Sequence, residues 1–291
     1  MGKKKRGLVV EGGGMRSAYA AGVLLALHDR GFNHFDIAVG SSAGACCAAN
    51  FVAGEPEKNR VILEDHLTSR NFVNLANLFN KKNILDIDFL IDEVCVKQVP
   101  LNLEKIRNAP TRLFITATDY LTGRLVYFNN REHDIHEALR ASCAMPFLYK
   151  KKAVYQNRRY LDGGLIASIP FEKAVEEGCD YVVVISTREK GYRKAKSKFP
   201  SPLYRVAYPK NPALIDLFSR RHEIYNETVR KISSSQSRKV HLIQPQSPLP
   251  VSRTTKDRRK VRSAVEIGYR DGEGFCEQVQ EKEIAGEPKI H

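Results

Sequence analysis

A short glycine-containing turn constrains the fold of this chain more than any other feature. The sequence Gly-Ser-Ser-Ala-Gly at positions 40–44 follows an apolar stretch, residues 35–39, and precedes a segment rich in alanine and cysteine. A strand that turns this sharply into a helix leaves one residue strained, so the neighbouring positions must be glycine or very small. Ser42 would lie at a helix N-terminus, where free N–H groups and the helix dipole favour negative charge. The pattern predicts that Ser42 is a nucleophile and that Gly40 and Gly44 permit its turn.

Apolar strand patterns and helical patterns alternate on both sides of this turn. The apolar run 7–10 is followed by a helical pattern at 16–30, and the run 35–39 by one at 43–53. Such alternation is typical of parallel strands joined by crossover helices. We therefore predict an α/β fold with a mostly parallel central sheet flanked by helices. Further strands are expected at 112–118, 124–128, 153–155, 158–161, 180–186 and 239–243.

The chain of 291 residues is long enough for one large domain. We expect a basic N-terminal tail at 1–6, an α/β domain at 7–245, and a proline-containing linker with a C-terminal helical extension at 246–291. Residues 189–212 are basic and contain several prolines, which predicts a loop. The longest apolar runs have five or six residues, too few for a membrane-spanning helix, which needs ~18. The basic residues at the N-terminus are followed by a very short apolar run that ends at Glu11. This run is too short for the apolar region of a signal peptide, so we expect no secretory signal.

The positive charge is concentrated in three segments. The formal net charge is +14, and the excess of lysine and arginine lies in residues 1–6, 188–210 and 252–262. Localised basic segments favour an anionic partner, either nucleic acid or an acidic membrane surface, although they also occur as solvated loops. Because no nucleic-acid-binding motif accompanies the charge, we expect no nucleic acid partner.

The six cysteines predict neither a metal site nor disulfide bonds. None forms a CxxC pair, no cysteine–histidine cluster has zinc spacing, and most lie in apolar stretches. This distribution is typical of reduced cysteines that serve as small hydrophobic residues. We expect no metal and no cofactor.

A glycine run follows the first predicted strand. The sequence Glu-Gly-Gly-Gly-Met-Arg at positions 11–16 allows successive N–H groups to converge on one anion ahead of a helix. The anion could be a phosphate or a reaction oxyanion. The dinucleotide-binding pattern fits only in part, because Ser17 replaces its third glycine and Asp36 lies inside a strand. Gly12, Gly13, Gly14 and Arg16 are the candidate anion-binding residues.

A third glycine motif, Asp162-Gly163-Gly164, follows the apolar segment 158–161. Taken alone it is an ordinary turn sequence. Together, the three motifs resemble those of the patatin-like phospholipase family, and the segment 140–146 (sequence RASCAMP) and the Ile-Pro pair at 169–170 are similar to further family motifs. The resemblance covers residues 7–186. Ser17 departs from the family pattern, which usually has glycine there.

The resemblance implies a patatin-like three-layer fold and a serine–aspartate dyad. Ser42 would attack an ester carbonyl, and Asp162 would accept its proton and return it to the departing alcohol. The amides of Gly12–Gly14 would stabilise the oxyanion, and Arg16 would help to hold that loop. An aspartate has an ordinary pKa near 3.9, so a dry pocket must raise its basicity. The implied activity is that of a serine acyl hydrolase acting on phospholipids or other lipid esters.

Two alternatives remain open at this stage. A Ser-His-Asp hydrolase would place its histidine after the acid in the sequence, and the candidates are His222, His241 and His291. None of them follows a strand in a loop, where a catalytic histidine is usually presented. A non-enzymatic lipid-binding protein is the other alternative, but the intact Ser42 and Asp162 argue against it.

The acyl chain of a lipid substrate requires apolar walls, and one apolar block lies between the nucleophile and the later strands. Alternatively, this apolar block could pack into the hydrophobic core without lining a pocket. We expect a cytoplasmic protein that binds reversibly at the inner face of the membrane if its basic segments share a face with the pocket mouth. The block comprises Phe72, Val73, Leu75, Leu78, Phe79, Ile84, Leu85, Ile87, Phe89, Leu90 and Ile91, and residues 147–149 are a second candidate for the pocket wall.

Overall fold

A single mixed sheet organises the molecule in this computed structural model, which describes residues 4–74, 76–77, 82–197, 201–209, 211–235 and 239–284. Within these residues, eight strands follow the order β5-β6-β3-β2-β1-β7-β8, and β4 pairs with β3. Strands β1, β2, β3, β7 and β8 are parallel, and β4, β5 and β6 form antiparallel pairs. The strands are β1 (Arg6–Val10), β2 (Ile37–Ser41), β3 (Arg112–Asp119), β4 (Leu125–Asn129), β5 (Ala153–Tyr155), β6 (Arg158–Asp162), β7 (Tyr181–Ile185) and β8 (Lys239–Ile243).

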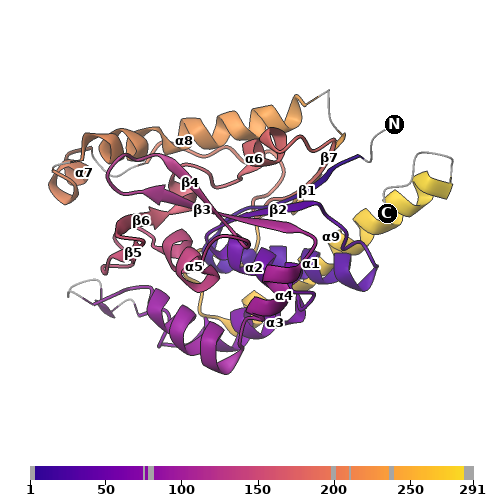
Figure 1. The fold of residues 1–291 in the computed structure, drawn as a ribbon, viewed down its shortest axis with the longest axis horizontal. Coiled ribbons are helices and arrows are strands. Elements are labelled where there is room, and N and C mark those ends of the chain that lie inside the picture. The colour runs from indigo at the N-terminus through magenta and orange to yellow at the C-terminus, as the bar shows by residue number, and fades with distance from the viewer. Residues whose placement is uncertain are drawn as a thin grey trace.

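Helices cover both faces of the sheet, as Figure 1 shows. On one side lie α6 and α8, and on the other lie α1, α2, α5 and α9. The helices are α1 (Ser17–Asp29), α2 (Ala43–Val52), α3 (Glu57–Val61), α4 (Leu103–Asn108), α5 (Ile135–Cys143), α6 (Phe171–Glu176), α7 (Ser201–Ala207), α8 (Pro212–Ser233) and α9 (Arg258–Ile284). Segments Ile62–His66 and Phe89–Gln98 are π-helical, and Gly14–Arg16 and Gly163–Leu165 are 3-10 turns.

The central strands are apolar on both faces because both faces are covered. In β1, Leu8 and Val10 belong to the core beneath α1 and α2, whereas Val9 belongs to the core beneath α6 and α8. Strands of parallel sheets are typically such continuous apolar runs. The predicted three-layer α/β fold with a mostly parallel sheet is confirmed.

The expected loop at 189–212 is wrong for its second half, because α7 occupies Ser201–Ala207. Tyr204 and Tyr208 turn toward α8, and the Tyr204 ring stacks on Phe218 with centroids 4.8 Å apart. These aromatic contacts bury enough apolar area to stabilise a short helix. The basic, proline-containing composition of the segment favoured the prediction of a loop, although Tyr204 and Tyr208 are spaced as on one face of a helix.

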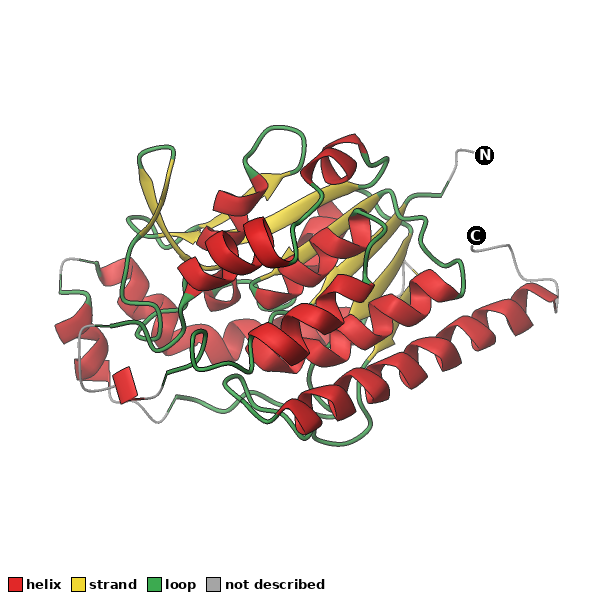
Figure 2. Cartoon of the chain, turned by 90° about the horizontal axis from the view of Figure 1, so that it is seen from below, coloured by secondary structure: helices red, strands yellow, loops and turns green. Residues whose placement is uncertain are grey.

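The C-terminal helix α9 packs into the main core. Figure 2 shows it as the long helix that leads to the C-terminus, running along its neighbours. Val261, Val265 and Phe275 of α9 are buried in the same core as α1. The two backbones approach closely: a Cβ atom at Gly268 would lie 2.0 Å from the Tyr19 carbonyl oxygen. Glycine is required at such a crossing because any side chain would separate the helices.

This crossing gives a stability prediction. Replacing Gly268 with alanine should force α9 away from α1 and lower the free energy of unfolding by roughly 1–3 kcal/mol, the usual cost of overpacking. Gly274 lies in the same helix, and a Cβ atom there would have no neighbouring atom within 4 Å, so Gly274→Ala should stabilise by up to ~1 kcal/mol through helix propensity. Urea denaturation of both variants measures the two effects. Equal stability of the two variants would mean that the helices do not depend on this close approach.

None of the helices in the described ranges is both long and apolar enough to cross a membrane.

Candidate active site

The carboxyl ends of β2 and β6 meet along one edge of β3, and the candidate site lies where they meet. On that edge, β2 runs parallel to β3 and ends where Ser41 pairs with Thr116. From the opposite direction, β6 runs antiparallel and ends where Asp162 pairs with Ala117. The other edge of β3 is occupied by β4. Since Thr116 and Ala117 are consecutive, the pairing brings the ends of β2 and β6 together.

Ser42 occupies the turn from β2 into α2 in a strained conformation. Its φ of 53° and ψ of −132° lie in a region that side-chain-bearing residues rarely adopt. The turn is close-packed: a Cβ atom at Gly44 would lie 2.5 Å from the Glu11 carbonyl oxygen, and one at Gly40 would lie 2.5 Å from the Ala45 Cα. The Ser42 N–H donates to Ser142 Oγ at 2.8 Å, which fixes the turn from the side of α5. These contacts hold the Ser42 hydroxyl in one direction.

The Ser42 hydroxyl points at the carboxylate of Asp162. Ser42 Oγ donates to Asp162 Oδ2 at 2.7 Å, and the Gly164 N–H donates to Asp162 Oδ1 at 2.7 Å. Asp162 is 4% exposed. Burial raises the pKa of this carboxyl above its ordinary value, while the hydrogen bonds from Ser42 and Gly164 act in the opposite direction. Gly163 lets the chain pass against β3, because a Cβ atom there would lie 2.1 Å from Thr116 Oγ1.

The glycine run lies beside the serine, and its N–H groups differ in their availability. The Gly12 N–H donates to the Ser168 carbonyl at 2.9 Å, and the Met15 N–H donates to the Arg253 carbonyl at 3.1 Å. Within the part of the chain that the structure describes, the N–H groups of Gly13 and Gly14 have no acceptor. Gly12 is therefore not a free donor, which differs from the expectation of three donors, and Gly13 and Gly14 are the available pair.

The residues that flank the glycine run tie it to the end of β7. Glu11 Oε2 accepts from Ser186 Oγ at 2.7 Å and from the Thr187 N–H at 2.6 Å. Arg16 is buried, and its Nε has no hydrogen-bond partner among the described residues. Burial, and then the neighbouring arginines 188 and 253, lower the pKa of Arg16 to about 10. Glu11 rather than Arg16 thus holds the loop by hydrogen bonds.

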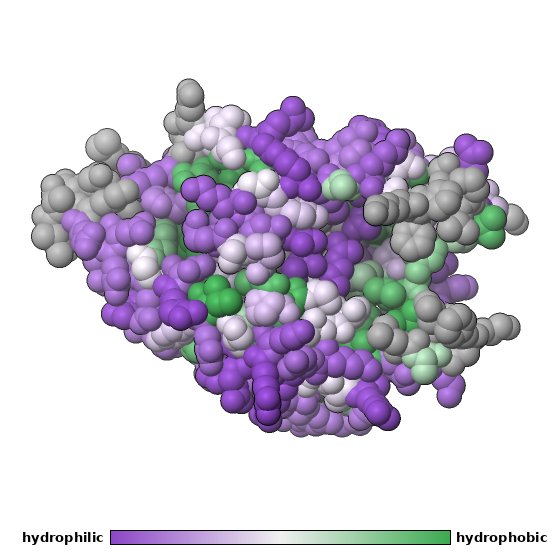
Figure 3. All heavy atoms as spheres, turned by 180° about the vertical axis from the view of Figure 1, so that it is seen from behind, coloured by the Kyte–Doolittle hydropathy of each residue, from purple (hydrophilic) through white to green (hydrophobic). Residues whose placement is uncertain are grey.

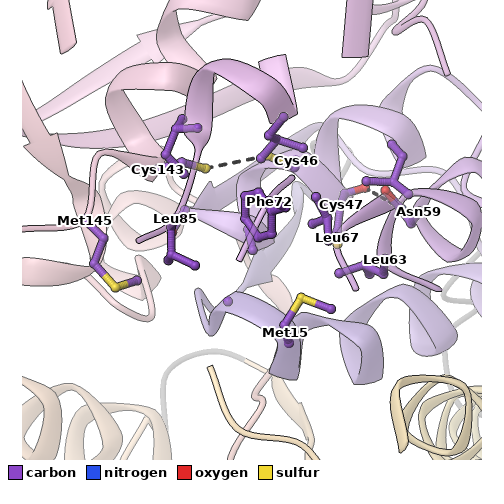
Figure 4. Close-up of a pocket in the computed structure, with 16 residues that line it drawn as sticks. Met15, Cys46, Cys47, Asn59, Leu63, Leu67, Phe72, Leu85, Cys143 and Met145 are labelled. Carbon is purple, nitrogen blue, oxygen red and sulfur yellow. Dashed lines mark hydrogen bonds between the residues drawn. The ribbon is translucent and has the colours of Figure 1, made fainter. Parts of the chain in front are cut away.

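An apolar cavity opens beside Ser42, and Figure 4 shows the side chains around it. Its volume is about 50 Å³, enough for a few water-sized spheres, so it is narrow. Cys46 and Cys143 lie together on one side, with their sulfur atoms 3.8 Å apart. The lining comprises Gly14, Met15, Ser42, Ala43, Cys46, Cys47, Asn59, Ile62, Leu63, Leu67, Phe72, Leu85, Ile87, Leu90, Cys143 and Met145.

The predicted apolar block supplies part of this lining. Phe72, Leu85, Ile87 and Leu90 border the cavity, whereas Val73, Ile84, Phe89 and Ile91 do not. Leu75, Leu78 and Phe79 lie outside the described residues. Of the second candidate segment, Phe147 is 47% exposed and packs against α7 and α8 instead.

No histidine contacts Ser42 or Asp162 within the described residues. His222 lies on α8 with its Nε2 3.8 Å from Glu223. His241 lies in β8 and packs against the rings of Tyr181 and Phe275. His291 falls outside the described residues. The described side chains also contain no group of three or more His, Cys, Asp or Glu residues placed to hold a metal ion.

Several supporting residues escaped the sequence analysis. Ser142, Ser168 and Thr187 each lie against the turn at Ser42 or the glycine run. Ser142 belongs to the segment 140–146, which resembles a family motif. The motif indicates that this segment matters, but it does not predict the contact of Ser142 with Ser42. Ser168 and Thr187 carry no local signal, because they reach the site only through the arrangement of the strands.

Comparison with known proteins identifies related sequences and folds. A family model described as patatin-like phospholipase matches residues 8–175, and a model described as a domain of unknown function, DUF6363, matches residues 211–282. The uncharacterized protein YjjU of Escherichia coli is 31% identical over 186 residues, which are 62% of this chain and 51% of YjjU. The uncharacterized NTE family protein Rv1063c of Mycobacterium tuberculosis is 28% identical over 187 residues, 62% of this chain and 48% of that protein. The chain thus spans about half the length of these relatives.

A solved structure shares the fold. The crystal structure of VipD from Legionella pneumophila aligns with a TM-score of 0.51 and 15% sequence identity, covering 95% of this chain and 67% of that chain. At this identity the likeness concerns the fold alone.

Proposed function

Because the chain belongs to the patatin-like phospholipase family, we propose that it is a serine acyl hydrolase that cleaves ester bonds of phospholipids or other lipid esters. The observation that carries this proposal is the 2.7 Å hydrogen bond from Ser42 Oγ to Asp162 Oδ2. The strained turn at Ser42 and the burial of Asp162 support it.

The first half of the reaction transfers the acyl group to the protein. Ser42 Oγ attacks the ester carbonyl carbon, and its proton passes to Asp162 Oδ2 as the new carbon–oxygen bond forms. The tetrahedral intermediate then expels the alcohol, which takes the proton from Asp162. The products of this step are the free alcohol and an acyl ester of Ser42.

The second half releases the acid. A water molecule attacks the acyl ester while Asp162 accepts its proton, and collapse of the intermediate returns a proton to Ser42 Oγ. Burial raises the pKa of Asp162, so its carboxylate is a stronger base than an exposed aspartate. The two free N–H groups of Gly13 and Gly14 are the proposed oxyanion donors in both halves.

The apolar cavity is the proposed site of the acyl chain. Met15, Cys46 and Met145 line it together with aliphatic residues. Methionine is flexible and adapts to irregular shapes, so the narrow cavity can widen when a chain enters. Its present volume suits a short apolar segment.

The glycine run gives a prediction for turnover. A Cβ atom at Gly13 would lie 2.8 Å from Thr187 Oγ1 and 3.2 Å from the Arg16 Cβ, so Gly13→Ala should rotate or displace the neighbouring N–H groups. Losing one oxyanion donor typically lowers kcat ~10²–10³-fold. We expect that loss with a nearly unchanged unfolding midpoint, measured by ester hydrolysis and thermal denaturation. Normal kcat in Gly13→Ala would remove this loop from the mechanism.

We also propose reversible contact with anionic membranes from a cytoplasmic location. Leu121, Phe147 and Val206 are well-exposed apolar side chains. Phe147 contacts Tyr208, which in turn contacts Tyr120, so Leu121 and Val206 are within two residues of this aromatic cluster in the chain. On the face shown in Figure 3, hydrophilic residues predominate and apolar residues form separate patches. Arg159 lies over the Tyr120 ring of this cluster, and exposed apolar side chains near basic residues suit a peripheral contact with acidic lipid.

A further inference from the structure

Five cationic side chains gather at the carboxyl ends of the parallel strands, next to the candidate active site. Arg16 follows β1, Arg188 and Lys194 follow β7, Arg253 follows β8, and Arg221 comes from the helix that covers them, α8. The carboxyl end of a parallel sheet is where ligands of α/β proteins usually bind. Residues 188–210 and 252–262 therefore contribute charge to the interior of the site as well as to the surface.

Hydrogen bonds hold three of these residues in place. Arg221 Nη2 donates to the Gly164 carbonyl at 3.3 Å, two residues after Asp162. The Arg253 carbonyl accepts from the Met15 N–H, and a Cβ atom at Gly14 would lie 2.6 Å from that carbonyl oxygen. The Lys194 N–H donates to Asn226 Oδ1 at 2.9 Å, and Asn226 Nδ2 donates back to the Lys194 carbonyl at 3.0 Å. These contacts attach the chain at Lys194 to α8, five residues after Arg221.

The positive charge of these five residues is only partly offset within the described chain, where Glu11 and Asp162 are the nearby carboxylates. None of the five side chains forms an ion pair with a described carboxylate. The carboxylate of Glu11 is close, but its Oε2 is occupied by Ser186 and Thr187. Arg16 is buried and the other four cations are half-buried, and cations withdrawn from water in this way are normally paired.

Buried donors in the group lack acceptors. Arg16 is only 6% exposed, and the Nε atoms of Arg16 and Arg221 are buried without a hydrogen-bond partner among the described residues. Burial, followed by the charges of Arg221 and Arg253, lowers the pKa of Lys194 to about 7. These donors and charges are suited to binding an anion.

We propose that Lys194, Arg221 and Arg253, with Arg16 beside them, bind the phosphodiester group of a glycerophospholipid substrate. This inference rests on the proposed function, because it assigns a head-group site to the same active site. With the phosphate held next to Gly164, the ester carbonyl lies on the side of Ser42 and the acyl chain enters the apolar cavity. Guanidinium groups match phosphate oxygens with two parallel hydrogen bonds, and lysine adds a point charge.

A different role for the same cations must be separated from phosphate binding. Arg221 and Arg253 also lower the pKa of Asp162, so they could act only by keeping the base ionised. That role predicts an equal loss of kcat for every ester. Phosphate binding predicts a loss of affinity that is confined to substrates with a phosphate.

The binding test uses the Ser42→Ala protein, in which no substrate is consumed. Isothermal titration compares dihexanoylphosphatidylglycerol with dihexanoylglycerol, which has the same acyl chains but no phosphate. We expect Lys194→Met and Arg253→Gln each to weaken binding of the phospholipid about tenfold or more, the usual scale for a charge-assisted hydrogen bond, with little change for dihexanoylglycerol. Lys196→Met is the matched control, because Lys196 is exposed in the same segment, and should change neither.

Further variants and a competition experiment complete the test. Arg253→Lys should recover part of the affinity, which excludes a general folding defect. Lys194 forms no ion pair with a described carboxylate, and its Nζ lies 4.9 Å from the centroid of the Tyr225 ring, so Lys194→Met should change the unfolding midpoint only slightly. Inorganic phosphate should compete with the phospholipid; if phosphate binds and the phospholipid does not, the site serves free phosphate and the lipid assignment is wrong. Equal affinity for the phospholipid in the Ser42→Ala protein and in both variants made from it would overturn the proposal.

Kinetics separate this inference from the proposed function. In the active protein, the KM for the phospholipid should rise in Lys194→Met and Arg253→Gln relative to the KM for dihexanoylglycerol. If no ester is hydrolysed but the binding pattern holds, the proposed function fails and the phosphate site stands. If both esters are hydrolysed and the two KM values change together, the phosphate site fails and the hydrolase stands.

Discussion

Replacing Ser42 with alanine is expected to abolish ester hydrolysis, with a loss on the order of 10⁶-fold in kcat, the scale observed when a serine nucleophile is removed. The variant keeps the strained turn, because the hydroxyl is not what holds it: Gly40, Gly44 and the Ser42 N–H bond to Ser142 remain. Labelling by a fluorophosphonate probe should disappear together with hydrolysis. Hydrolysis of p-nitrophenyl butyrate and gel detection of the probe measure the two effects.

The neighbouring serine provides the control for this experiment. Ser41 is fully buried in β2, and its Oγ has no hydrogen-bond partner among the described residues. Ser41→Ala therefore removes a hydroxyl without breaking a contact, so labelling and turnover should be retained. A Ser42→Ala protein that still reacts with the probe would show that another residue is the nucleophile.

Replacing Asp162 with asparagine is expected to lower kcat by ~10²–10⁴-fold, the usual contribution of a general base. The amide keeps nearly the same shape and can still accept the Gly164 N–H, but it cannot take the proton of Ser42. The folded structure should survive, which circular dichroism and the unfolding midpoint would show. Single-turnover kinetics with a chromogenic ester measure the loss.

Histidine variants decide between the dyad and a triad. His222→Ala should leave kcat nearly unchanged, because no histidine of the described chain contacts Ser42 or Asp162. His241→Ala should affect stability through its ring contacts rather than kcat. A folded His222→Ala or His241→Ala protein as inactive as Asp162→Asn would replace the dyad with a triad.

The pH profile follows from the same carboxyl group. Asp162 accepts a proton only when it is ionised, so kcat/KM should fall as the pH falls through the pKa of this group. Because burial raises that pKa, the acid limb should lie above pH 3.8, the ordinary value for aspartate. Asp162→Asn should lack this limb. A limb that persists unchanged in Asp162→Asn would assign it to another group.

The fold and the positions of the two proposed reacting residues could be predicted from local patterns. Strands in a parallel sheet are short apolar runs, and a serine between glycines after such a run is recognisable without any distant contact. The same holds for Asp162, which the two following glycines mark. The amphipathic helix α7 was missed because a basic, proline-containing segment has the composition of a loop.

The tertiary structure decided which glycine N–H groups already have a hydrogen-bond acceptor. Gly12 and Gly13 are equivalent in the sequence. In the structure the Ser168 carbonyl accepts a hydrogen bond from the Gly12 N–H, whereas the Gly13 N–H has no acceptor among the described residues. The glycine pattern shows that N–H groups can converge, and only the neighbouring strands determine which of them already have an acceptor. The close packing of α9 on α1 was likewise hidden, since a glycine in a helix gives no sign of what it contacts.

The sequence by itself determined the α/β fold, the strained turn at Ser42 and the identity of Asp162, because each depends on neighbouring residues. Only the tertiary structure decided that the two meet, since their distance depends on β2 and β6 ending at adjacent residues of β3. The same holds for Lys194, Arg221 and Arg253, which are far apart in the chain. A basic segment has the same composition whether its charges face solvent or a binding site, and only the packing of the strand ends determines which of them are buried.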